Sequence, residues 1–169
     1  GHFSTIQVPT KGLAKAALAA RVDGELVDLS HRFTGNAALA LVTSRDEAEA
    51  LDLARQTGNR FLAANVHGNL GRLEYKQADY LNARKDFENA LRLFREIGNI
   101  YGESMVLYFL GFIDIALDNN EAARPLLHES IRLSHKIGAT TVTLIALCGV
   151  ARLYARAGEP ERAVELLGM

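Results

Sequence analysis

Few residues in this sequence have the type and spacing that catalysis or metal binding requires. His128 and His135 lie seven positions apart, which is about two helical turns and too far for both rings to bind one metal ion. The single cysteine, Cys148, stands within "LIALCGV", where a small buried side chain is expected rather than a nucleophile. The sequence contains neither a phosphate-binding Gly-Lys-Ser/Thr loop nor a dinucleotide-binding glycine triplet. We therefore predict no enzyme activity, no cofactor and no metal site.

The overall charge gives no argument for a nucleic acid or a membrane surface as the partner. The chain has 19 Lys and Arg against 20 Asp and Glu residues, with a pI of about 6.6. Its most apolar stretch, residues 105–117, contains Asp114 and is shorter than the roughly 20 residues that span a bilayer. One cysteine and no secretory signal predict a cytoplasmic location. We interpret Gly1 and His2 as a remnant of an expression vector.

The sequence repeats itself with a period of 40 residues. The segments "RQTGN", "REIGN" and "HKIGA" place glycines at Gly58, Gly98 and Gly138. Two further columns keep the same step: Ala83, Ala123 and Ala163, and Leu70, Leu110 and Val150. Three columns in one register predict an array of repeated structural units.

Each period predicts two amphipathic helices joined by a tight turn. We expect first helices at residues 60–77, 100–117 and 140–157, and second helices at 80–97, 120–137 and from 160 onward. A lone second helix is expected at 44–58. Glycine follows the second helices because the residue after a helix often adopts a left-handed backbone conformation. Pro160 suits a first helical residue, whose amide needs no partner.

Small and large apolar residues alternate in a pattern that points to a known family. Leu70, Gly71, Tyr80, Ala83, Phe87 and Ala90 resemble the consensus of the tetratricopeptide repeat (TPR) family, as do Leu110, Gly111, Ala123 and Leu127 in the next unit. Departures are Glu74 and Asp114 in place of an aromatic residue, Ser130 in place of alanine, and Ala151 in place of glycine. The resemblance covers residues 44–169. It implies a mainly α fold, a solenoid of antiparallel helix hairpins, with full repeats at 60–98 and 100–138 and a truncated repeat at 140–169.

The first 43 residues do not follow the repeat and predict a small α+β segment. Residues 3–9 and 38–43 alternate as strands do, and Asp23-Gly24 lies between the two alternating arms of residues 20–31. A short helix is expected at residues 11–18. Residues 12–51, with "GLAKAAL" followed by "VDGELVD", are similar to the TGS domain of bacterial threonyl-tRNA synthetases. This resemblance implies a truncated, β-grasp-like cap at residues 1–43, without the catalytic motifs of a synthetase.

In a TPR array the first helices line the concave face, and this register gives the predicted binding residues. We expect a groove with an aromatic and aliphatic middle between basic ends, suited to a peptide or protein segment with an apolar anchor and acidic groups. Met105, Phe112 and Ile115 could instead pack between helices. The predicted groove residues are Asn65, Asn69, Arg72, Tyr75, Lys76, Tyr108, Phe112, Arg152 and Arg156.

Three functions are compatible with these patterns. The first is a non-catalytic protein-protein interaction scaffold. The second is the regulatory sensor domain of a larger regulator, because 40-residue TPR arrays resemble the sensor portion of bacterial signal-transduction ATPase transcription regulators. The third is an engineered or shuffled chimera of a TGS-like segment and a TPR array without a physiological ligand. The last repeat has no polar capping helix, which predicts self-association through Leu153, Val164 and Leu167.

Overall fold

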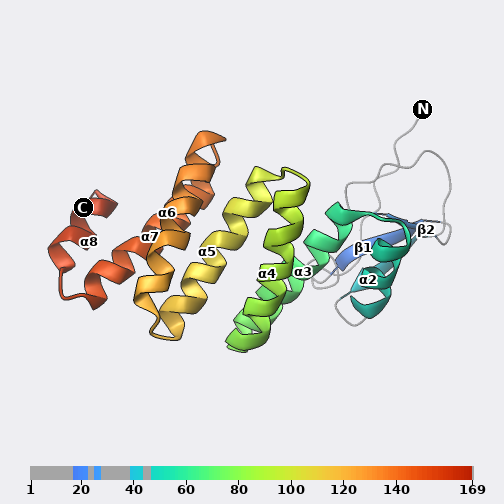
Figure 1. Cartoon of the computed structure of the whole chain (residues 1–169), viewed down its shortest axis with the longest axis horizontal. Helices are drawn as coiled ribbons and strands as arrows, with labels where there is room; N and C mark the ends of the chain where they lie inside the picture. The colour runs from blue at the N-terminus through green and yellow to red at the C-terminus, as the bar shows by residue number, and fades with distance from the viewer. Residues whose placement is uncertain (1–16, 23–24, 28–38, 44–46, 169) are drawn as a thin grey trace.

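A computed structural model describes residues 17–22, 25–27, 39–43 and 47–168 of the chain. Within these residues the fold is mainly helical, and the helices stand side by side in an elongated array with a small sheet next to its first helix (Figure 1). The strands are β1 (Ala17–Val22), β2 (Glu25–Val27) and β3 (Leu39–Thr43). The helices are α2 (Glu47–Gln56), α3 (Arg60–Lys76), α4 (Tyr80–Glu96), α5 (Ile100–Ala116), α6 (Asn120–Lys136), α7 (Thr140–Arg156) and α8 (Pro160–Leu167).

The three strands form an antiparallel sheet in the order β2-β1-β3. Val22 pairs with Glu25 and Ala20 with Val27, which confirms the predicted pairing of the strands on either side of Asp23-Gly24. The strand predicted at residues 38–43 is also confirmed as β3. The helix predicted at 11–18 is wrong at its end, because Ala17 and the residue after it belong to β1. The rest of that helix and the strand predicted at 3–9 lie outside the described residues.

The helix hairpins follow the predicted register closely. Each helix from α3 to α7 has 17 residues, and the first helices of successive units begin 40 residues apart, at Arg60, Ile100 and Thr140. Three of the N-caps are side chains that accept a hydrogen bond from the first helical turn: Asn59 from the Leu62 amide, Asp79 from the Asn82 amide and Asn99 from the Gly102 amide. These caps satisfy amides that a helix start leaves unpaired.

Every helix from α3 to α7 is followed by a residue in the left-handed conformation. Gly98 has φ of 68° at the end of α4, as the glycine column predicted. The ends of α3 and α5 use the same conformation with Ala78 (φ 60°) and Asp118 (φ 61°). A side chain makes this conformation costly by roughly 1 kcal/mol. The turn geometry is therefore imposed by packing of the hairpins even where glycine is absent.

The core of the first hairpin is built on a close approach between α3 and α4. Ala83 and Ala90 are fully buried, and Phe87 is 1% exposed. A Cβ added to Gly71 would lie 2.9 Å from the Phe87 ring, so only glycine fits beneath that ring without a shift. Gly102 bears the same relation to Phe94, at 2.6 Å. The predicted helix crossings at small residues are thus confirmed.

The departures from the repeat consensus have local partners. Buried Asp114 on α5 forms an ion pair with Arg84 on α4. At the equivalent positions one unit later, 40 residues on, the Arg124 guanidinium lies over the Tyr154 ring, 5.6 Å from its centroid. The same contact between a second helix and the following first helix is therefore made by an ion pair in one unit and a cation–π contact in the next. Ser130 is also satisfied, because its hydroxyl donates to the Ser104 carbonyl at 2.7 Å.

A second repeat position exchanges polar for apolar residues and yields a stability prediction. His67 Nδ1 and Asp86 Oδ1 lie 2.6 Å apart, with both side chains 17% exposed. The next unit has Leu107 and Leu126 at these positions. Replacing a largely buried polar pair with packed apolar residues is often neutral or stabilising. We expect His67→Leu/Asp86→Leu to keep or raise the free energy of unfolding, measured by urea denaturation. Asp86→Leu alone, which leaves His67 without its partner, should lower it.

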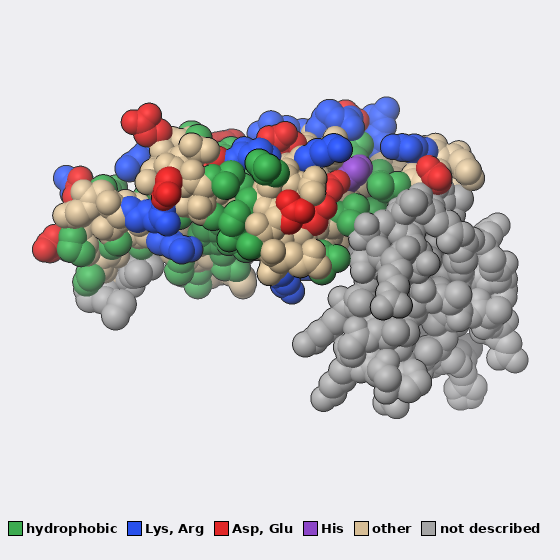
Figure 2. All heavy atoms as spheres, turned by 90° about the horizontal axis from the view of Figure 1, so that it is seen from below, with side chains coloured by type: hydrophobic (Ala, Val, Ile, Leu, Met, Phe, Trp, Pro, Cys, Tyr) green, Lys and Arg blue, Asp and Glu red, His purple; other side chains and the backbone are tan. Residues whose placement is uncertain are grey.

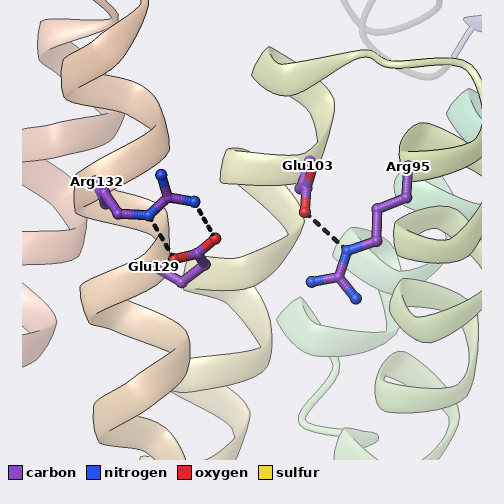
Figure 3. A network of polar contacts seen from close by, with 4 residues as sticks. All are labelled: Arg95, Glu103, Glu129 and Arg132. Carbon is purple, nitrogen blue, oxygen red and sulfur yellow. Dashed lines mark hydrogen bonds and ion pairs between the residues drawn. The ribbon is translucent and has the colours of Figure 1, made fainter.

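Charged side chains on the array largely pair with one another. Arg95 on α4 donates to Glu103 on α5 at 2.7 Å, and Arg132 holds Glu129 through two hydrogen bonds of 2.8 and 2.6 Å on α6 (Figure 3). The hydrogen bonds from Arg132 lower the pKa of the Glu129 carboxyl. Figure 2 shows acidic and basic side chains interspersed over one side of the array, with Lys and Arg gathered along its upper edge in that view.

Apolar side chains are exposed at the α7–α8 end of the array. Val164 is 46% exposed and Leu144 is 56% exposed. The prediction for Leu153 is wrong: it is 2% exposed because it packs in the core cluster that joins α5, α6 and α7. Leu167 lies outside the residues whose side chains are described. No helix in the described part of the chain has the length and apolar character needed to cross a membrane.

Candidate functional site

The first helices α3, α5 and α7 present one common surface, which we call the first-helix face. Its positions fall in five rows, each row taking the equivalent residue from α3, α5 and α7, because residues 3, 4, 7 and 11 apart share one side of a helix. None of the residues in these rows is Asp or Glu. The rows are Phe61, Tyr101 and Thr141; Asn65, Met105 and Ile145; Gly68, Tyr108 and Cys148; Arg72, Phe112 and Arg152; and Lys76, Ala116 and Arg156.

Three of the predicted basic residues lie exposed on this face. Arg72, Lys76 and Arg152 are all solvent-accessible, and no ion pair to them is found among the described residues. Arg72 instead donates to the Asn69 side chain at 2.9 Å. The Asn65 amide donates to the Phe61 carbonyl one turn back, at 3.0 Å. The three cations are therefore positioned to meet acidic groups from outside the chain.

Arg156 has a different role from the one predicted. Its guanidinium Nη1 donates to the Ile115 carbonyl and to Asp118 Oδ1, each at 2.6 Å. It thereby satisfies a carbonyl that the end of α5 leaves free and pairs with the acidic residue of the following turn. Arg156 joins α7 to α5 and is not a free acid-binding group. It also lines a cavity of about 110 Å³ with Arg124 and Leu153, which is smaller than a typical small-molecule site.

The predicted aromatic anchors are tied into the core. Tyr108 is only 8% exposed and packs against Phe109 and Phe112, with ring centroids 4.4 and 5.8 Å apart. Tyr75 is partly buried and contacts Phe109 edge-on at 5.7 Å. The prediction of Tyr108 as an open anchor is therefore wrong, because it packs between helices. Phe112, which is partly buried, remains accessible from the face.

The two tyrosines report on the electrostatics of the face. Burial raises the pKa of the Tyr75 phenol, and the positive charge of Arg152 partly offsets this effect. Burial likewise raises the pKa of Tyr108, and Arg72 opposes it. Tyr75 lies on α3 and Arg152 on α7, so the field of one first helix reaches another two units along the array.

The raised tyrosine pKa values predict a loss of stability at high pH. A phenol whose pKa is higher in the folded chain holds its proton more tightly there than in the unfolded chain. Its contribution is complete below the ordinary tyrosine pKa of about 10 and is lost as pH rises through the folded pKa. We expect the midpoint of urea unfolding to fall steeply above pH 10 and to fall less in Tyr75→Phe/Tyr108→Phe. Ultraviolet titration should show phenols that ionise late only in the unsubstituted chain.

The sequence-based prediction missed the exposed aromatic residues of the face. Phe61 is 44% exposed and Tyr101 is 53% exposed, and they occupy equivalent positions on α3 and α5. Their 40-residue spacing and their place in the same register as Arg72 are visible in the sequence and could have identified them. The prediction of a buried Cys148 is wrong. This residue is exposed, because its position lies between the two exposed edges of the face rather than against a second helix.

The histidines also have exposed positions. His128 and His135 lie on the solvent side of α6. Within the described ranges, no group of three or more His, Cys, Asp or Glu side chains is arranged to hold a metal ion.

Comparison with known proteins finds similarity in one segment only. No protein-family model matches the chain. A segment of 55 residues, 32% of this chain, is 69% identical to the threonine-tRNA ligase of Novosphingobium aromaticivorans. Over the same length the identity is 64% to the ligase of Erythrobacter litoralis and 58% to that of Sphingopyxis alaskensis. This segment is similar to the TGS region of those ligases.

The match covers little of the ligases themselves. The chain spans 8% of the length of each of these three relatives. The catalytic part of a ligase is not included in the matched segment. The resemblance of the N-terminal region to a threonyl-tRNA synthetase segment is thus confirmed, whereas the helical array has its own, separate character.

Proposed function

We propose that α2 to α8 form a TPR-type solenoid whose first-helix face binds a peptide or a protein segment with acidic groups. The observation that supports this proposal is the charge of the face: Arg72, Lys76 and Arg152 are exposed there without described ion pairs, whereas most exposed arginines elsewhere are paired. Unpaired cations on a face that lacks carboxylates favour an anionic partner.

The arrangement of the helices also supports a preformed binding surface. α3, α5 and α7 are fixed by cores on their opposite sides, where Phe87, Leu110 and Leu127 are buried. A surface held by packed helices needs little ordering when a partner binds, which favours affinity. The chain has no catalytic constellation among the described residues, so binding is the activity that this surface can supply.

The test is a selection from a phage-displayed peptide library with Arg72→Ala/Arg152→Ala as the comparison. We expect peptides selected on the unsubstituted chain to be rich in Asp and Glu and to bind the double variant at least about tenfold more weakly, a change of about 1.4 kcal/mol. Affinity should also fall with added salt, because the cations are exposed.

A matched control separates the face from net charge. Lys85→Ala/Lys136→Ala removes the same two positive charges from exposed positions on α4 and α6, away from the first-helix face. This control should bind the selected peptides with unchanged affinity. If both double variants lose affinity equally, the partner responds to overall charge and the proposed binding face is wrong.

A second candidate follows from the comparisons. Similarity to the ligases is confined to 32% of the chain, which favours a shuffled or engineered chain in which a TGS-like segment is joined to a helical array without a physiological ligand. The same selection distinguishes the two candidates. A selection that yields no peptide dependent on Arg72 and Arg152 would favour the chimera.

A further inference from the structure

We infer that the partner of the first-helix face is an amphipathic α-helix with one acidic and one apolar stripe, lying across α3, α5 and α7. This inference rests on the proposed function and specifies its ligand. It comes from the way in which the five rows of the face divide by chemistry and by height.

The two sides of the face have different chemistry. Near the N-terminal ends of the first helices the side chains are apolar: Phe61 and Tyr101 are exposed, and Met105 is partly exposed. Near the C-terminal ends the exposed side chains are the cations Arg72, Lys76 and Arg152. A partner that satisfies both sides must present apolar groups along one edge and acidic groups along the other.

The row between these two sides projects least. It contains Gly68, which has no side chain, the nearly buried Tyr108 and the small Cys148. Phe61 and Arg72, on either side of it, are 11 residues apart on α3, which corresponds to about 16 Å along the helix axis. The face therefore has two raised edges and a low middle.

The width between the edges decides the conformation of the partner. An α-helix with its side chains is about 10–12 Å across and can touch both edges when it lies over the middle row. The side chains of an extended strand lie in a narrower band and would reach one edge at a time. A helix also places acidic and apolar residues in separate stripes through its 3.6-residue period. The geometry thus matches a helix better than an extended peptide.

The test uses three fluorescein-labelled peptides of about 18 residues, five helical turns. The first has a Glu stripe beside a Leu stripe. The second has the same composition in an order that mixes the stripes. The third is the first with two central prolines, which prevent a helix. Fluorescence anisotropy gives the affinities, and circular dichroism measures the helicity gained on binding.

The expected result is that the striped peptide binds and gains helicity, and that the other two bind at least about tenfold more weakly. Phe61→Ala/Tyr101→Ala and Arg72→Ala/Arg152→Ala should each weaken binding of the striped peptide about tenfold, whereas Lys85→Ala/Lys136→Ala should not. All substituted positions are exposed, and thermal melts will verify that the variants fold.

The outcomes separate this inference from the proposed function. Equal binding of the proline-containing peptide, with loss in Arg72→Ala/Arg152→Ala, would overturn the helix and leave the binding face intact. Equal binding of the mixed-order peptide, or no loss in Phe61→Ala/Tyr101→Ala, would overturn the two-stripe arrangement. If no peptide binds, the inference is wrong, and the library selection decides the proposed function independently.

Discussion

Replacing Arg84 with Ala is expected to lower the free energy of unfolding by about 3–5 kcal/mol. Asp114, whose side chain is 3% exposed, loses its ion-pair partner in this variant. A carboxylate buried without a compensating charge is strongly unfavourable, because it has left water without a replacement for its hydration. Urea denaturation at neutral pH measures the loss.

The next unit supplies the control for this prediction. Arg124→Ala removes the equivalent side chain, which lies over the Tyr154 ring rather than beside a carboxylate. An exposed cation–π contact contributes only about 0.5–1 kcal/mol. Adding Asp114→Tyr to Arg84→Ala should recover stability, because it removes the unpaired charge and introduces the residue type of the next unit. Equal losses in Arg84→Ala and Arg124→Ala would show that burial of Asp114 is unimportant.

Phe87→Ala is expected to lower the free energy of unfolding by about 3–5 kcal/mol. The ring is 1% exposed, stacks on Phe109 at 4.8 Å between centroids and covers Gly71. Its removal leaves a cavity between α3, α4 and α5 in addition to the lost burial of apolar surface. Denaturant unfolding followed by circular dichroism gives the value.

The contact between Phe87 and Gly71 provides a double-mutant cycle. Gly71→Ala alone places a methyl group 2.9 Å from the ring and should be destabilising, despite the better helix propensity of alanine. In the Phe87→Ala background the same methyl group has room and should be neutral or stabilising. Additive effects in the cycle would contradict the close approach of these two residues.

The Arg84 and Phe87 predictions concern stability, and they bear on the binding face because the same contacts position it. Phe109 packs against Phe87 from the core and against Tyr75 and Tyr108 from the face. A cavity at Phe87 should therefore loosen the aromatic cluster beneath the face. The Arg72 and Arg152 variants leave that cluster unchanged, so they test recognition separately from stability.

Much of the helical array could be predicted from local sequence signals. The 40-residue period, the glycines that end the second helices and Pro160 at the start of α8 act within one or two turns of chain. The caps at Asn59 and Asn99 are of the same kind. Such features are set by backbone sterics and nearby hydrogen bonds, so the sequence determined the order and the bounds of the helices almost to the residue. Exposure of Arg72 and Arg152 followed from the same register.

What only the tertiary structure decided concerns residues whose partners are distant in the sequence. Asp114 is paired with a residue 30 positions away, and Arg156 with groups 38 and 41 positions away. Tyr108 has the periodicity of an exposed residue but is buried by its neighbours, and Cys148 has apolar neighbours in sequence but is exposed. Periodicity gives the side of a helix on which a residue lies. How deeply neighbouring helices cover that side depends on their packing distances and side-chain volumes, which only the assembled array fixes.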